Sequence, residues 1–191
     1  MVGYPPRDQD SLRNRVNPRV QIIGCGMVGS SIANELINTR WDEISELRIV
    51  DIDQDRLRGE YYDLKRVIAI KDVDLNLKKT PFPGLGYDIS IITMGQRCRY
   101  DLFKRREDAI NDLFTRNWPS IFRVVDRLRG GRIIIVTNPA DMIARTLRKH
   151  FPKRNIVHAG DFIDEIHDGK EIHELKGFTN WGIAAEVGGM L

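Results

Sequence analysis

The sequence predicts an α/β protein built on a doubly wound parallel sheet. From Val20 onward, short apolar segments alternate with amphipathic segments of helical period, which is the pattern of parallel strands covered on both faces by helices. The first apolar segment leads directly into glycines spaced G-x-G-x-x-G, and a carboxylate, Asp51, ends the second. This order of strand, glycine turn, helix and second strand favours a nucleotide-binding form of the fold.

The expected strands are short apolar runs bounded by turn residues. The run at 75–79 is weak and is closed by Pro81 and Gly84, whereas the run at 155–157 is the expected sixth strand. The remaining four consist mainly of Ile and Val, as strands buried on both faces do: residues 20–23, 47–50, 88–93 and 132–136.

Helices are expected between these strands, where apolar residues recur at helical spacing. The first places Val28, Ile32 and Leu36 on one stripe. Pro119 is expected to kink the third. The fourth starts at Pro139, where the missing N–H of proline costs nothing. The expected helices cover residues 30–38, 55–70 and 109–128, the segment after Pro139, and about 171–187.

Length and composition fit one domain with a small appendage. The chain has 191 residues, of which 41% are hydrophobic and 30% charged, so it can bury a real core. We expect a flexible arm at 1–18, a nucleotide-binding domain at 19–160 and a short helical remnant of a second domain at 161–191. No apolar run has membrane-spanning length. The two cysteines, Cys25 and Cys98, form no disulfide framework, and a cytoplasmic location is expected.

Basic clusters leave a nucleic-acid-binding module as one alternative. Each cluster carries or adjoins acidic residues and lies at an expected helix end, and none shows the interleaved aromatic residues of RNA-binding surfaces. Solvated faces are therefore the favoured interpretation, and no nucleic acid or membrane partner is expected. The clusters are residues 13–19, 104–106, 127–132 and 148–154.

The glycine motif and Asp51 together indicate a dinucleotide site of the Rossmann type. The glycines permit a tight turn, approach of a pyrophosphate to the backbone, and close packing of helix and strand. Asp51 lies twenty-two residues beyond Gly29, where a carboxylate accepts the hydroxyls of an adenine ribose and repels a 2′-phosphate. A purely structural glycine turn is the alternative.

Seven segments in order resemble the L-lactate/malate dehydrogenase family, most closely animal-type L-lactate dehydrogenase. The last of them, Leu175-Lys176-Gly177-Phe178-Thr179-Asn180-Trp181-Gly182-Ile183, favours the lactate enzyme over the malate enzyme. The others are the glycine loop 23–29, Val50-Asp51, 57–64, Ile91-Ile92-Thr93-Met94-Gly95, Arg116-Asn117, and Val136-Thr137-Asn138-Pro139-Ala140-Asp141.

The resemblance implies that NAD is the cofactor and that a hydride moves between its nicotinamide and a small 2-hydroxy or 2-keto acid. Asn138 would also touch substrate, although an asparagine there could equally be a helix N-cap. Thr179 and Ile183 match the positions lining the substrate pocket, with a helix core as the alternative for Ile183. The residues implied in cofactor binding are Gly24, Gly26, Met27, Val28, Gly29, Asp51, Thr93, Gly95 and Asn138.

The family's acid–base residues are only partly matched. Such enzymes use a histidine oriented by an aspartate, because hydride transfer is coupled to proton transfer. Asp164 matches the aspartate, but His167 stands where an arginine should bind the substrate carboxylate, and the segment carrying the catalytic histidine is absent. On a helix His167 would meet Asp164, which makes it the candidate replacement.

A mobile polar loop is expected at 96–108, beyond the carboxyl end of a strand. In the family an arginine of this loop polarises the substrate carbonyl as the loop closes. Arg106 and Arg105 are the preferred candidates for that role. Cys98 occupies the position that discriminates between substrates, so lactate and malate both stay open.

Three functions follow from these residues. The first is an L-lactate dehydrogenase-like NAD-binding protein, with the family reaction of (S)-lactate and NAD⁺ to pyruvate and NADH, although the missing block makes turnover by this chain doubtful. The second is an inactive NAD-binding remnant or splice form acting through partners, and the third is the nucleic-acid module. The resemblance implies a homo-oligomer, and no metal site is expected.

Overall fold

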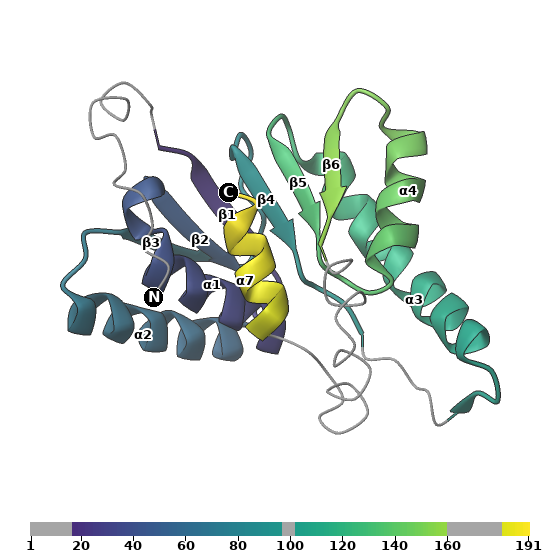
Figure 1. Cartoon of the computed structure of the whole chain (residues 1–191), viewed down its shortest axis with the longest axis horizontal. Helices are drawn as coiled ribbons and strands as arrows, with labels where there is room; N and C mark the ends of the chain where they lie inside the picture. The colour runs from purple at the N-terminus through teal and green to yellow at the C-terminus, as the bar shows by residue number, and fades with distance from the viewer. Residues whose placement is uncertain (1–16, 97–101, 160–180) are drawn as a thin grey trace, which may run out of the picture.

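The doubly wound parallel sheet is confirmed by a computed structural model, which describes residues 17–96, 102–159 and 181–191. Six parallel strands lie in the order β3-β2-β1-β4-β5-β6, with helices on both faces (Figure 1). The strand order reverses between β1 and β4, whose carboxyl ends therefore border the crevice where ligands of this fold bind.

The elements follow the predicted sequence of strands and helices. The strands are β1 (Arg19–Ile23), β2 (Glu46–Val50), β3 (Asn76–Thr80), β4 (Ile89–Ile92), β5 (Arg132–Ile135) and β6 (Asn155–His158). The helices are α1 (Met27–Thr39), α2 (Gln54–Lys71), α3 (Arg106–Arg127), α4 (Ala140–His150) and α7 (Trp181–Gly189), with a 3₁₀ turn η2 (Trp41–Glu43). No helix within the described ranges is long and apolar enough to cross a membrane.

Alternation along the strands divides the apolar residues between two cores. Ile22 pairs in register with Ile49 and Ile91, and their side chains pack with those of α1, α2 and α7. Ile23 and its neighbours in register face the opposite side, where α3 and α4 cover them. Strands buried on both faces favour apolar residues at most positions, which explains their Ile-rich runs, while the buried Gln21 and Ser90 bond to each other.

Helix α7 packs beside α1 on the first of these faces (Figure 1). Ile183, Ala184 and Val187 are buried in the same core as α1. At the end of the chain, the Arg132 guanidinium donates a hydrogen bond of 2.6 Å to the Met190 carbonyl oxygen. The last residues thus return to the sheet and close one of its faces.

Three expected helices differ in their bounds by more than one residue, and the first of them, α1, begins at Met27 rather than at residue 30. Helix α3 begins at Arg106 rather than at residue 109, because Glu107 and Asp108 lie in its first turn, where carboxylates stabilise a helix. Pro119 lies inside α3 and does not end it. The described part of the C-terminal helix begins at Trp181 and extends to Gly189, two residues past the predicted end, while most of its predicted span lies outside the described residues.

A buried ionic network covers the amino-terminal half of β2. The Glu46 carboxylate accepts hydrogen bonds from Lys78 and Tyr87, and Arg48 lies 3.5 Å from it. Burial alone would raise the pKa of Glu46, but these hydrogen bonds and the positive charges of Lys78 and Arg48 lower it below its usual value. Burial and the bond to Glu46 raise the pKa of Tyr87 to about 12, so the phenol remains a donor.

Replacing Glu46 with Gln should lower stability at neutral pH, and the loss should shrink in acid. A carboxyl group whose pKa is lowered by folding contributes stability above its unfolded value of 4.5 and loses it as the pH falls through the folded value. We expect urea denaturation to show a loss of about 1–3 kcal/mol at neutral pH. Asp55→Asn, at a side chain 92% exposed, is the control. A Glu46→Gln loss that stays constant into acid would contradict this account.

Candidate dinucleotide site

The glycine turn between β1 and α1 is shaped by contact with the end of β4. Gly24 has a φ of +110°, and a Cβ there would lie 2.5 Å from the Met94 amide nitrogen. Gly29 lies one turn into α1, where a Cβ would lie 1.9 Å from the Gly24 carbonyl oxygen. The Thr93 hydroxyl donates a hydrogen bond of 2.6 Å to that same oxygen. The fold itself therefore requires Gly24 and Gly29, whether or not a ligand binds.

Gly26 differs, because packing gives no reason for it. Its φ of −74° suits any L-residue, and a Cβ there would meet nothing within 4 Å. It is the N-cap of α1, where no side chain caps the helix and the first turn carries no acidic residue. The first amides of a helix lack intrahelical partners, and with the open space they fit a pyrophosphate group. The chain would hold such a group here through backbone N–H groups.

Asp51 follows β2 directly and lies against the glycine turn. Its carboxylate accepts hydrogen bonds of 2.7 Å from the Cys25 amide and 2.9 Å from the Asp53 amide. These bonds orient the carboxylate at the same edge of the sheet as the turn. The position fits the predicted ribose contact, while the bond to Cys25 adds a structural role that sequence did not reveal.

Cys25 has no character of a nucleophile. Burial, and secondarily the charge of Asp51, raise the pKa of its thiol to about 12, so it stays protonated near neutral pH. Its sulfur lies 3.6 Å from the Val50 carbonyl oxygen.

The other side of the crevice is formed by the segments after β4 and β5. Thr137 is buried and donates hydrogen bonds to the carbonyl oxygens of Ile92 and Met94, at 3.1 and 2.7 Å. Asn138 follows with an exposed side chain. The N-cap of α4 is Pro139, without a side-chain cap, so the interpretation of Asn138 as a helix cap is wrong. Asn138 is therefore an exposed residue that does not cap α4.

Of the remaining predicted residues, the structure describes Arg105, Arg106 and Ile183. Arg105 is the N-cap of α3 and pairs with Glu107 at 2.6 Å, and Arg106 is the first residue of that helix, so the predicted polar loop ends before 106. Ile183 is 8% exposed within the core under α1, which agrees with its core interpretation. The other candidates, Asp164, His167 and Thr179, with Cys98, lie outside the described residues.

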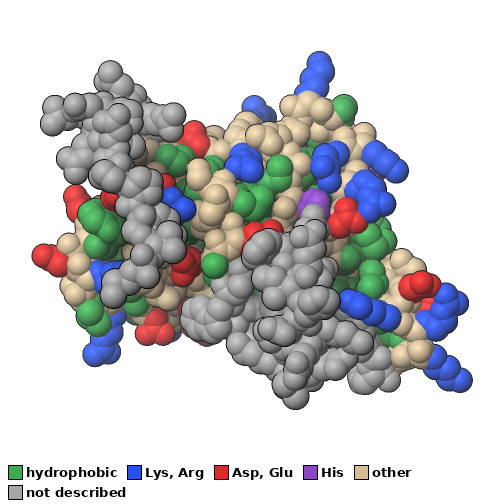
Figure 2. Space-filling view, in the orientation of Figure 1, with side chains coloured by type: hydrophobic (Ala, Val, Ile, Leu, Met, Phe, Trp, Pro, Cys, Tyr) green, Lys and Arg blue, Asp and Glu red, His purple; other side chains and the backbone are tan. Residues whose placement is uncertain are grey.

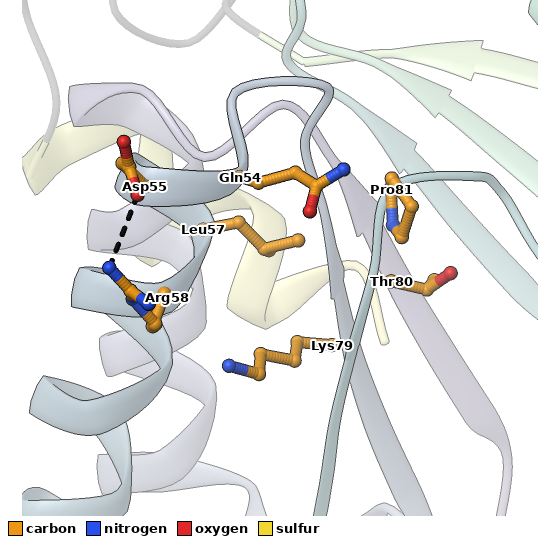
Figure 3. A pocket seen from close by; sticks show the side chains of 7 residues that line it. All are labelled: Gln54, Asp55, Leu57, Arg58, Lys79, Thr80 and Pro81. Atoms are coloured by element: carbon orange, nitrogen blue, oxygen red, sulfur yellow. Dashed lines mark hydrogen bonds and ion pairs between the residues drawn. The ribbon is translucent and has the colours of Figure 1, made fainter.

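A separate hollow of about 240 Å³ lies between α2 and the end of β3 (Figure 3). Leu57, Lys79 and Thr80 line it, and the Asp55–Arg58 ion pair spans one side. None of the predicted cofactor residues lines this hollow. It does not change the location of the candidate site.

The family described as "lactate/malate dehydrogenase, NAD binding domain" matches residues 18–158. The chain belongs to this family. L-lactate dehydrogenase of Staphylococcus haemolyticus is 24% identical over 148 residues, covering 76% of this chain and 46% of that protein, and L-lactate dehydrogenase 1 of Staphylococcus aureus is 27% identical over 152 residues with the same coverage. The chain thus spans about half the length of these relatives.

Solved structures of dehydrogenases share the fold. Malate dehydrogenase from Salinibacter ruber matches with a TM-score of 0.62 and 25% identity, over 84% of this chain and 50% of that one. A lactate dehydrogenase from a Medee basin deep-sea metagenome library matches with a TM-score of 0.63 and 22% identity, over 86% of this chain and 52% of that one. Membership of the family makes NAD the cofactor of this domain.

Substitutions at Gly26 and Gly29 should separate binding from folding. Gly26→Ala should cost about 1 kcal/mol or less, as a poorer N-cap, and Gly26→Ser should cost less because Ser is a good cap. Both place a Cβ in the open space and should weaken NADH binding, measured by calorimetry, at least tenfold. Gly29→Ala drives a Cβ into the backbone at 1.9 Å and should lower the melting temperature severely. Unchanged NADH affinity in both Gly26 variants would contradict this assignment.

Proposed function

We propose that this chain is the NAD(H)-binding half of an L-lactate dehydrogenase-type oxidoreductase and binds the cofactor across the β1–β4 crevice. The open helix terminus at Gly26 carries this proposal, because the protein's own packing does not account for that glycine. The pyrophosphate is assigned to this terminus. The adenosine half then extends toward Asp51 and the nicotinamide half toward Asn138.

Charge at the adenosine end supports NAD over NADP. Asp51 is followed by Asp53 and Asp55, and the two later carboxylates lie at the start of α2. A 2′-phosphate would add negative charge beside them. The Asp53 side chain caps α2 by accepting a hydrogen bond of 3.1 Å from the Arg56 amide, which leaves Asp51 as the carboxylate directed at the crevice.

NAD would supply the hydride, and the chain's residues would bind and orient it against a small 2-keto acid such as pyruvate. Asn138, Thr179 and Ile183 are proposed on the substrate side. Arg106 or Arg105 would polarise the substrate carbonyl, and the Asp164–His167 pair would act as general acid and base. A general acid or base contributes about 10²–10⁴-fold, so loss of the family's histidine predicts turnover lower by at least that factor. A homo-oligomer remains a proposal from the family relationship.

The nucleic-acid alternative gains no support from the arrangement of charge. In Figure 2 the Lys and Arg side chains are denser on the β6 and α4 side, and Asp and Glu lie among them. Several of these cations are paired, as Arg145 is with Asp141 and Arg116 is with Asp112. A duplex-binding surface would instead present a continuous basic stripe.

Cofactor preference should depend on Asp51. We expect NADH to bind at least tenfold more tightly than NADPH, measured by calorimetry, and Asp51→Asn to narrow that ratio by removing the charge that repels the 2′-phosphate. Asp55→Asn is the matched control because it removes an exposed charge from the same acidic run. Melting temperatures accompany the titrations, since Asp51 also holds the Cys25 amide. Equal affinity of the unmodified chain for both cofactors would refute the proposed role of Asp51.

Turnover is measured on the same sample that binds NADH. Oxidation of NADH is followed with pyruvate and, separately, with oxaloacetate at high protein concentration. We expect slow turnover at most, reduced further by His167→Ala and by Arg106→Ala if these residues act as proposed. Saturable NADH binding without any turnover would end the proposal that this chain acts alone as a dehydrogenase.

A further inference from the structure

We infer that Asn117 is a positioning residue for the nicotinamide end of the cofactor. It joins the segment after β4 to the segment after β5, and it acts through them without touching the ligand itself. The inference rests on the proposed binding of NAD(H) across the crevice.

Asn117 makes one hydrogen bond to each of the two segments. Its side-chain oxygen accepts a hydrogen bond of 2.8 Å from the Gln96 amide. Its side-chain nitrogen donates a hydrogen bond of 3.0 Å to the Asn138 carbonyl oxygen. The residue is 3% exposed, so water offers little replacement for either bond.

The two segments approach each other closely at this point. A Cβ on Gly95 would lie 2.6 Å from the Thr137 methyl group and 3.1 Å from the Asn117 amide nitrogen. Gly95 is therefore required by this contact. Arg116, the preceding residue of α3, adds a bond of 2.6 Å to the side chain of Gln96. Two adjacent residues of one helix thus hold the start of the loop that follows β4.

The two hydrogen bonds require a side chain that both accepts and donates. One partner is an N–H and the other a carbonyl oxygen, so the side chain must accept and donate at once. Aspartate can accept but not donate, and leucine can do neither. Asparagine is also a poor helix former, so its place in the middle of α3 is not explained by helix propensity. The two hydrogen bonds explain it.

The consequence concerns Asn138. Its carbonyl oxygen accepts a hydrogen bond from Asn117, and Asn138 itself is exposed just after β5, on the side where the nicotinamide is proposed to bind. Without the hydrogen bond from Asn117, the backbone after β5 could shift. Contacts between this segment and the nicotinamide half depend on the position of the segment to a fraction of an ångström. The adenosine half lies on the Asp51 side and does not depend on this bond.

The test compares NADH with ADP, which carries the adenosine and the pyrophosphate but no nicotinamide. Calorimetry on Asn117→Ala should show NADH affinity about tenfold lower and ADP affinity within twofold of the unmodified chain. Asn117→Asp keeps the acceptor but loses the donor, and should show the same selective loss. The change in NADH fluorescence on binding should decrease in both variants.

Ser90→Ala is the matched control. Ser90 is also 3% exposed and accepts a hydrogen bond of 2.9 Å from Gln21, but it lies within β4 away from the crevice. A melting-temperature loss in this variant should leave the ratio of NADH to ADP affinity unchanged.

Three results would overturn the inference. Equal weakening of NADH and ADP by the Asn117 variants would show a general loss of structure, and no weakening would show that Asn117 is dispensable. The same selective loss in Ser90→Ala would show that any destabilisation produces it. Failure of the unmodified chain to bind NADH would instead refute the proposed function, and the inference with it, so the two failures are distinguishable.

Discussion

The close approach of α1 to the ends of β1 and β4 is the contact on which the rest of the structure depends. Gly29 meets the Gly24 carbonyl oxygen with no room for a Cβ, and the Thr93 hydroxyl bonds to the same oxygen. This places the start of α1 over the point where strand order reverses. Helix α7 packs against the same helix, so the open terminus at Gly26 and the covered face of the sheet share α1.

The two sides of the crevice are held by different chemistry. On the side proposed for adenosine, Asp51 accepts hydrogen bonds from two backbone amides, so its carboxylate also stabilises the turn. On the side proposed for the nicotinamide, the neutral side chains of Thr137 and Asn117 join the segments that follow the strands. A charged group there would be costly to bury, whereas hydroxyl and amide groups are satisfied by backbone partners.

The sequence predicted what depends on neighbours along the chain. The parallel sheet covered by helices followed from periodicity and spacing, and family membership is confirmed. The cofactor-binding roles of Gly24, Gly29 and Asp51 stay predictions. The structural role of Asn117 did not follow, because Gln96 and Asn138 each lie 21 residues away and meet only in the fold. The sequence predicted the start of α3 three residues too late, because its acidic first turn resembles a polar loop. The N-cap of α4 is Pro139 rather than Asn138.

The face of the sheet beside α1 is covered by the C-terminal helix α7. Helix α7 buries Ile183, Ala184 and Val187 against α1, and Arg132 bonds to the Met190 carbonyl, so the face beside α1 is covered by residues of the same chain. None of these contacts involves the residues proposed for proton transfer. The chain spans about half the length of its dehydrogenase relatives, and the described part holds a shaped turn at Gly26 with open space beside it.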